Sequence, residues 1–247
     1  MFFFRIIYRR LTKNALSQIF QGRMKIRDKP EAGRFLQSDV RKIYDSAWVN
    51  IDRIRSESDL GIYPNLGNRH NVYLAIMTIG FYHALLDAGI DRNYAIELFA
   101  DVGWKIYVKF ISLPKRIVRI IISDPQLQMN MMLRMFMRFP FSPAGRPGYE
   151  GKGWAEEGQF LTHWTFCAPF HFVMQYSETH GDRGEADVFY RSWCWFDWPL
   201  AYAMVEGSGK PGYYTRPHTL SLGDEVCDMC WAAERPSKSG SVDLSAA

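Results

Sequence analysis

The segment NVYLAIMTIGFYHALLDA, from Asn71 to Ala88, decides how this chain folds. Apolar residues occupy almost every side of the helix that it would form, so no polar stripe is left to face water. Because a helix that is apolar all round must be covered by other elements, the segment predicts a buried central helix. Gly89 follows it directly, and glycine is the residue type that ends helices most readily.

Further helices are predicted on both sides of this segment. Residues 36–58 carry apolar side chains at three- and four-residue spacing, which predicts a helix with one face on the core. Asp91 is a suitable N-cap for a helix that continues through Val102, and Pro114 is expected to separate it from the apolar run 117–122.

A methionine-rich run follows at residues 129–139. Thioethers fill irregular gaps, so the run predicts core packing, with a lipid-facing or substrate-facing surface as the alternative. Residues 140–153, PFSPAGRPGYEGKG, are dense in Pro and Gly and have no apolar period. They predict a loop that acts as a boundary or a lid.

The C-terminal third has a different composition from the rest. Residues 160–172 alternate aromatic and small side chains, which predicts a strand. Residues 185–206 are typical of a helix that breaks at Pro199, with Asp197 near the start of its second piece. Two short segments, 215–222 and 225–232, flank the hairpin-like turn signal Gly223-Asp224.

This order of elements predicts an α+β protein. A helical N-terminal two-thirds is expected to pack on a small antiparallel sheet that the C-terminal third mainly forms. Residues 28–235 are predicted to be a single domain, and the Ser-rich residues 236–247 a flexible tail.

Residues 1–27 predict a basic amphipathic helix, with an apolar face of Phe, Ile and Leu and with Arg5, Arg9, Arg10 and Lys13. It is expected either to pack on the body as a terminal helix or to dock on a membrane surface or a partner. On the docking hypothesis, the rest of the chain would fold without it.

Composition limits the class of protein. The 247 residues are 47% hydrophobic with a net charge of +4, and Lys and Arg are scattered beyond residue 27, so a nucleic-acid partner is not predicted. The 15% aromatic content suits a pocket for a small-molecule substrate. Four cysteines do not make a disulfide scaffold, and we find neither a secretory signal nor a run of ~18 apolar residues. We therefore expect reduced thiols in a cytoplasmic protein, membrane-associated only if the N-terminal helix docks.

Reactive side chains concentrate in the last third of the chain. All four cysteines and four of the six histidines lie there: Cys167, Cys194, Cys227, Cys230, His163, His171, His180 and His218. This concentration favours one site built from distant segments.

Cys194-Trp-Phe-Asp197 places a thiol and a carboxylate three residues apart, which is one face of a helix. A carboxylate can orient a base or a water and can help to activate a thiol. Taken alone, the four residues are equally compatible with a buried inert cysteine beside a capping aspartate.

Cys227-Asp-Met-Cys230 has the spacing of a metal knuckle or a redox pair. A closed zinc site needs two more ligands, and neither a second C-x-x-C nor an H-x₃-H is present. A strand would also direct the two thiols to opposite faces of the sheet. We therefore assign no metal ligands and expect no cofactor, and a divalent metal held by the cysteines stays open as the alternative.

These residues give the chain a resemblance to the L-2-amino-thiazoline-4-carboxylic acid hydrolase family, also called ATC hydrolase-like. Thr165-Phe166-Cys167 matches the family's cysteine after a strand, although Ala168 displaces the proline that follows by one position. Cys194-Trp-Phe-Asp197 matches its Cys-x-x-Asp element. The segment RPHTLSLGDEVCDM, from Arg216 to Met229, matches its C-terminal element, with Met in place of Phe. A looser similarity extends the resemblance over about residues 60–232.

The resemblance implies hydrolysis of a carbon–nitrogen bond, other than a peptide bond, in a small cyclic amidine or amide-like substrate. It implies nucleophilic or acid–base roles for Cys194, Asp197, Cys227, Asp228 and Cys167. Arg216 would clamp a substrate carboxylate, and the rest of the substrate site would comprise His163, His171, Trp198 and Thr219. A thiol mechanism would require one cysteine to be partly ionised near neutral pH.

Two other functions stay open. The same scaffold would suit a non-hydrolytic enzyme, a cyclase or lyase that acts on a natural-product intermediate. A helical body with an aromatic pocket, a Met-rich run and a basic N-terminal helix would also suit a non-enzymatic protein that binds a hydrophobic ligand or docks on a membrane. A homodimer is compatible with all three functions.

Overall fold

Helix α3 (Leu66–Asp87) is the centre of the fold, as its apolar sequence predicts. The computed structural model describes residues 2–236, and within them 17 of the 22 residues of α3 are buried. Asn65 caps its N-terminus by accepting a hydrogen bond from the backbone N–H of Asn68. The helix begins five residues before the expected segment because this cap, and not the apolar run, sets its first turn.

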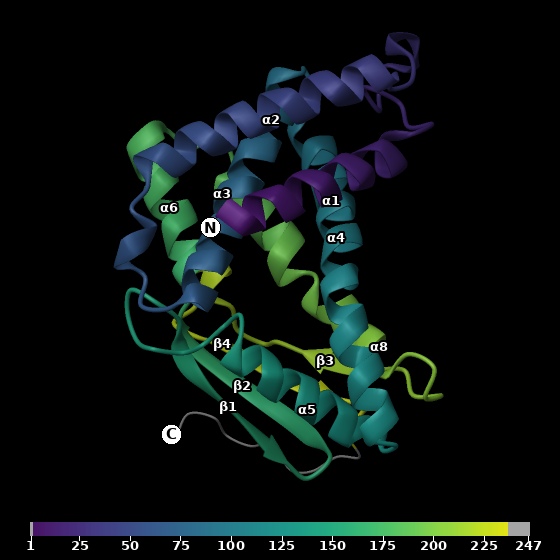
Figure 1. Ribbon diagram of the computed structural model, residues 1–247, viewed down its shortest axis with the longest axis vertical. Helices are drawn as coiled ribbons and strands as arrows, with labels where there is room; N and C mark the ends of the chain where they lie inside the picture. The colour runs from purple at the N-terminus through teal and green to yellow at the C-terminus, as the bar shows by residue number, and fades with distance from the viewer. Residues whose placement is uncertain (1, 237–247) are drawn as a thin grey trace.

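Helix α2 (Gln37–Glu57) crosses α3 in close contact (Figure 1). Gly80 makes this approach feasible, since a Cβ there would lie 2.5 Å from Cγ1 of Ile51 and 3.2 Å from the carbonyl oxygen of Ala47. The apolar stripe predicted for residues 36–58 is buried against α3. Helix α6 (Ala168–His180) packs on α3 as well.

Helix α4 (Arg92–Ile121) corrects the expectation of a break at Pro114. Asp91 caps it as predicted, by accepting a hydrogen bond from Tyr94 N–H, but the helix runs through the proline and is 30 residues long in all. Proline removes one helical hydrogen bond. Ile111 and Val118, about one turn before and after it, are both buried in the core above the sheet, and their packing holds the helix together.

Helix α5 (Pro125–Arg138) contains most of the methionine-rich run. Met129 and Met132 are fully buried, as core packing predicts, whereas Met131 and Met135 are exposed. Together with helix α8 (Asp197–Val205), α5 packs on one side of the sheet, where side chains of both helices contact Phe160, Tyr214 and Trp231.

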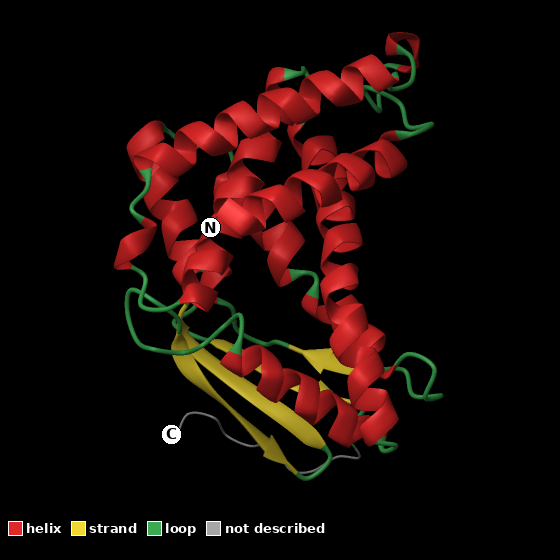
Figure 2. Ribbon diagram, viewed as in Figure 1, coloured by secondary structure: helices red, strands yellow, loops and turns green. Residues whose placement is uncertain are grey.

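The sheet has four antiparallel strands in the order β1-β2-β4-β3 and lies at one end of the molecule (Figure 2). Their bounds are β1 Glu150–Glu156, β2 Gln159–Phe166, β3 Tyr213–Thr215 and β4 Cys227–Ala232. With its helices mostly N-terminal and its sheet C-terminal, the protein has the predicted α+β fold.

Three local predictions are wrong. Residues 150–153 are not loop but the start of β1, where Gly151 leaves room for the ring of Trp164. The predicted strand 160–172 ends at Phe166, and Cys167 begins α6, because Pro169 fits the first turn of a helix and cannot donate to a ladder. The segment 215–222 is not a continuous strand, since it contains the short 3₁₀ turn Leu220–Leu222 before Gly223 with φ of 96°.

The helical segment 185–206 is interrupted earlier than Pro199. It consists of α7 (Glu185–Phe189), the π-helical segment η3 (Tyr190–Cys194) and α8. Asp197 is the first residue of α8, as predicted, and Pro199 occupies the first turn, where its missing N–H costs nothing.

The N-terminal helix α1 (Phe2–Phe20) stops seven residues short of the predicted helix 1–27. Its inner face is part of the main core, since Tyr8, Leu16 and Phe20 are at most 2% exposed and pack in one cluster with α2, α3 and α4. Expectations for the tail 236–247 lie outside the described residues, except for Pro236. Among the helices of residues 2–236, none combines the length and the hydropathy needed to cross a membrane.

Candidate functional site

Three of the four thiols meet where the helical core joins the sheet. Cys167 follows β2 and precedes α6, Cys194 ends η3, and Cys227 begins β4. Cys167 contacts both the helical cluster and the small cluster that contains Cys227. The three lie close enough that ionisation of Cys194 or Cys227 would raise the pKa of Cys167. The structure thus brings together three residues that the sequence placed 27 and 33 positions apart.

Two hydroxyl groups link Cys194 to Cys227. The sulfur of Cys194 lies 3.3 Å from Oγ of Ser221, Ser221 lies 3.2 Å from Oγ1 of Thr219, and Thr219 lies 3.4 Å from the sulfur of Cys227. The backbone N–H of Leu220 donates to the same sulfur over 3.1 Å. The 3₁₀ turn that starts at Leu220 therefore forms one wall of the site.

Arg216 and Asp197 form an ion pair beside these thiols. Nη1 of Arg216 donates to Oδ2 of Asp197 over 3.1 Å, and the hydroxyl group of Tyr214 donates to the same oxygen over 3.1 Å. The guanidinium carbon lies 4.9 Å from the centre of the Trp198 ring, within the range of a cation–π contact. Trp198 itself is 44% exposed and covers the pair from the solvent side.

The guanidinium of Arg216 is buried but incompletely paired. Its side chain is only 2% exposed, and neither Nε nor Nη2 has a hydrogen-bond partner among residues 2–236. Burial of an unpaired donor costs about 1–3 kcal/mol, and more for a charged group. Two free donors on the fork of an arginine are the geometry that binds a carboxylate or phosphate bidentately.

Burial also changes the protonation of the neighbouring groups. It raises the pKa of Asp197 to about 6, although Arg216 and Tyr214 both favour the carboxylate. It raises the pKa of Cys194 to about 12, against the opposing effect of Arg216, and raises the pKa of Cys227 and of Cys167. The thiols are therefore neutral at pH 7, contrary to the partial ionisation that a thiolate mechanism requires, and Asp197 is the group that titrates near neutrality.

Asp228 does not join this cluster. Successive strand residues face opposite sides of a sheet, so Asp228 lies on the other face of β4 from Cys227. There it accepts hydrogen bonds from the backbone N–H of His218 (2.9 Å) and from Nδ1 of the same residue (3.0 Å). Its carboxylate holds the loop before Thr219 in place and faces away from the thiols.

The two histidines assigned to the substrate site also lie outside it. His163 pairs with Asp228 in the register of β2 and β4 and so shares that opposite face. His171 is exposed in the first turn of α6, with its ring against Phe166. Of the five residues expected to bind substrate, Arg216, Trp198 and Thr219 are at the site.

The fourth thiol is separate as well. Cys230 lies on the opposite face of β4 from Cys227, as the strand prediction requires, and donates to Oε1 of Gln159 over 3.1 Å. Within residues 2–236, no three His, Cys, Asp or Glu side chains are grouped so that they could hold a metal ion.

Sequence reasoning missed three residues of the site. Tyr214 bonds Asp197, Ser221 bonds Cys194, and Tyr149 hydrogen bonds with the Cys167 thiol, an interaction that favours the thiolate. Tyr214 precedes Arg216 by two positions and extends from the same side of its strand, which was an available signal. Ser221 and Tyr149 are in irregular segments, where no sequence periodicity could indicate their positions.

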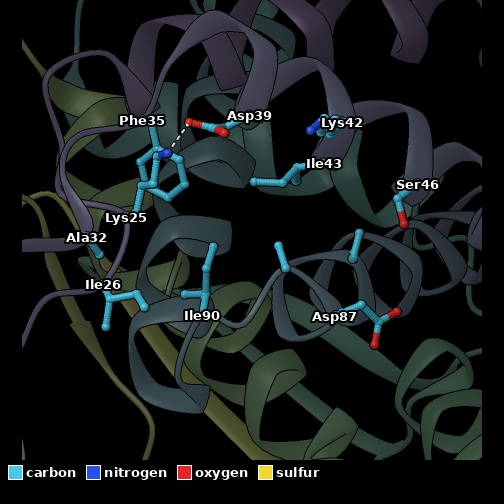
Figure 3. Close-up of a pocket in the computed structure, with 12 residues that line it drawn as sticks. Lys25, Ile26, Ala32, Phe35, Asp39, Lys42, Ile43, Ser46, Asp87 and Ile90 are labelled. Atoms are coloured by element: carbon cyan, nitrogen blue, oxygen red, sulfur yellow. Dashed lines mark ion pairs between the residues drawn. The ribbon is translucent and has the colours of Figure 1, made fainter. Parts of the chain in front are cut away.

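Two surface hollows lie away from the thiols. The first, about 390 Å³, is bounded by α2, the turn between α3 and α4 and the segment before α2 (Figure 3). Lys25 and Asp39 form an ion pair of 2.9 Å at its rim, and Phe35, Ile43 and Ile90 line it. The second lies between α2 and α6, next to Tyr63 and His180. Neither contains a residue of the thiol cluster.

Comparisons of the chain with models of protein families, with curated proteins and with solved structures found no match.

Proposed function

We propose that this protein is a hydrolase that acts on a carbon–nitrogen bond of a small, cyclic, amidine-like or amide-like substrate bearing a carboxylate. The observation that carries the proposal is the buried Arg216. Its Nη1 binds Asp197, but its Nε and Nη2 have no hydrogen-bond partner in the part of the chain that the structure describes. An anionic group of a ligand would satisfy both donors at once. The similarity of Cys194-Trp-Phe-Asp197 and of the segment after Arg216 to ATC hydrolase-like proteins supports the same reaction class.

In this proposal Asp197 performs the proton transfers. With a pKa of about 6 it is mainly carboxylate at pH 7, ready to act as a base, and once protonated it is a strong enough acid to return the proton. As a carboxylate it takes a proton from the attacking water, and as a carboxylic acid it returns that proton to the departing ring nitrogen. One water is consumed and no net proton is left on the enzyme.

Cys194 has two roles open to it within this mechanism. Since burial raises its pKa to about 12, it is a neutral thiol before substrate binds and would hydrogen bond to the ring or to the water. It would attack covalently only if substrate binding allowed Asp197 to remove its proton, because the thiolate is the nucleophilic form.

A non-hydrolytic reaction is the second candidate, and the neutral thiols are compatible with it. A cyclase or lyase step needs an acid–base group and an anchor for the substrate, which Asp197 and Arg216 provide, but it needs no thiolate. The two reactions differ in whether the product gains the mass of one water.

The test is incubation of the full chain with 2-amino-thiazoline-4-carboxylate and related cyclic amidines, followed by mass spectrometry of the product. Hydrolysis adds one water, whereas a lyase or cyclase product does not. Asp197→Asn and Arg216→Gln should abolish turnover, and Cys230→Ser, on the opposite face of the sheet, should leave it unchanged. Binding of the carboxylate compounds without turnover by the wild-type chain would instead identify a binding protein.

A further inference from the structure

One end of the molecule presents an apolar stripe that nothing within residues 2–236 covers. On the second half of α4, Leu113, Ile117, Ile120 and Ile121 are 65%, 50%, 85% and 76% exposed. They recur at three- and four-residue spacing, and therefore share one face of the helix, opposite the buried Ile111 and Val118. Leu127, 56% exposed, continues the stripe in the first turn of α5. We call these five residues the α4–α5 tip.

The segment that builds the tip is mainly positive. Residues 109–134 contain five Lys or Arg and one acid, Asp124, and Glu206 at the end of α8 adds a second acid. Asp124 is engaged as the N-cap of α5, accepting a hydrogen bond from Leu127 N–H over 2.7 Å. Lys115 pairs with Glu206, but within the described residues no carboxylate pairs with Lys109, Arg116, Arg134 or Arg138, which are all exposed.

The tip lies at the extremity of the fold. Helix α4 extends past the helical core to the level of the sheet, and its last turns and the start of α5 stand at the lower right of the molecule in Figure 1, beside the sheet. The connection from α4 to α5 is three residues long, so both helix ends project as one hairpin.

We propose that the α4–α5 tip docks on an anionic lipid bilayer. A helix face with large apolar residues and flanking cations lies in the interface plane, with its apolar side among the acyl chains and its cations at the headgroups. A second copy of the chain is a poorer occupant, because it would bring two surfaces of the same charge together. Single exposed apolar residues are common on protein surfaces, but four large ones that lie together on one helix face form a continuous apolar patch, which marks an interaction surface.

This surface differs from the one predicted for the membrane, the basic helix of residues 1–27. The described side chains of α1 are largely engaged within the protein: Arg5 pairs with Asp52, Arg9 lies 4.9 Å from the Trp48 ring, and the inner face is buried. The α4–α5 tip has no such internal partners among its apolar residues.

The test is co-sedimentation of the full chain with vesicles of phosphatidylcholine alone and of phosphatidylcholine with phosphatidylserine. Binding to the second kind only, reduced by high salt, is expected. The pair Ile120→Ser with Ile121→Ser, and the pair Arg116→Glu with Arg134→Glu, should each lower the partition coefficient by roughly tenfold or more. As matched controls, Val49→Ser with Ile62→Ser changes two exposed apolar residues elsewhere, and Arg10→Glu with Lys13→Glu changes two exposed cations of α1. Both controls should bind as the wild type does.

Three outcomes would overturn the proposal. The first is that the wild-type chain sediments with neither kind of vesicle. The second is that the α1 pair of substitutions abolishes binding while the tip pairs do not. The third is that the tip variants still bind vesicles but change the mass measured by analytical ultracentrifugation, which would make the tip a contact between copies of the chain. Thermal unfolding of each variant, compared with the wild type, shows that a loss of binding does not come from a loss of folding.

Discussion

Arg216 and Asp197 lie 3.1 Å apart at the junction of the helical core and the sheet, and Asp197 uses only one of the three guanidinium nitrogens. Asp197 starts α8 and Arg216 directly follows β3, so the pair links these two elements. The two unused donors are free to bind an anionic group, and we expect a ligand to supply that group.

Replacement of Arg216 tests that expectation directly. In Arg216→Gln the anchor for an anionic group is lost, and affinity for a carboxylate ligand should fall by about 2 kcal/mol, or roughly 30-fold. Arg216→Lys should recover little, since an ammonium group lacks the planar fork. Isothermal titration calorimetry with 2-amino-thiazoline-4-carboxylate as the probe measures the affinity of both variants. Arg191→Gln, which alters a partly exposed arginine on η3, serves as the control and should not change affinity.

The pH dependence of the reaction should report Asp197. Its pKa is raised to about 6, so the carboxylate form increases as pH rises through 6. If the first step needs the base, kcat/KM should climb between about pH 5 and 7 and then level off. In Tyr214→Phe the carboxylate loses a hydrogen bond that stabilises it, so the inflection should move to higher pH. An inflection that stays at the same pH in this variant would show that another group titrates.

Local patterns predicted most of the helices because each signal there depends on neighbouring residues only. The all-round apolar segment predicted α3, the Asp91 cap predicted the start of α4, and Asp197 was expected where α8 begins. The errors arose where packing between distant segments overrides a local rule. Pro114 remains helical because buried neighbours hold it, and Gly151 is in a strand because the ring of Trp164 occupies the space.

Only part of the candidate site was predicted, and the reason for the errors is related. Cys227 and Asp228 are adjacent in sequence, and both were assigned to one site, yet strand alternation separates them. That error was avoidable, since the same rule had already separated Cys227 from Cys230. The position of Ser221 was not predictable, because it depends on a 3₁₀ turn that is closed by Gly223 in the left-handed region.

The three clustered thiols should react slowly with alkylating agents. Burial raises the pKa of Cys194 to about 12, so at pH 7 only a very small fraction is thiolate. Iodoacetamide should therefore label Cys230 before Cys194, since Cys230 lies outside the cluster, on the opposite face of β4, although burial raises its pKa as well. Peptide mapping after a short exposure measures the order. Rapid labelling of Cys194 would favour a mechanism in which its thiolate attacks the substrate over the one in which Asp197 activates water.

Helix α1 should prove to be part of the folded body. Phe20 is fully buried and its ring centre lies 4.6 Å from that of Phe35, so Phe20→Ala should destabilise the protein by about 3–5 kcal/mol. Deletion of residues 1–27 should then prevent folding, whereas it would be tolerated by a detachable docking helix. Urea unfolding followed by circular dichroism distinguishes the two. The exposed Ile6→Ala is the control and should cost less than about 1 kcal/mol.

A buried carboxylate away from the candidate site should make stability depend on acid. Glu185 is completely buried in α7, and its carboxylate lies 2.5 Å from Nε2 of His83 on α3. Ser177 and the backbone N–H of Arg183 donate to its other oxygen over 3.0 and 2.8 Å. Burial alone would raise the pKa of Glu185, but these hydrogen bonds and His83 outweigh it and lower the pKa to about 2.

The sign of the effect follows from the two pKa values of Glu185. In the unfolded chain a glutamate titrates near 4.3, so the folded state binds this proton less readily. The interaction should contribute its full stability above about pH 4 and lose it as pH falls from about 4 towards 2, an amount of about 3 kcal/mol. Glu185→Gln keeps one oxygen that can accept from His83 but removes the carboxylate that His83, Ser177 and the Arg183 N–H share, so it should lower the free energy of unfolding at pH 7 by about 1–3 kcal/mol. Urea unfolding at pH 7 and at pH 3 measures both quantities. The wild type should lose more stability than the variant between the two pH values, and equal losses would mean that Glu185 is not ionised in the folded protein.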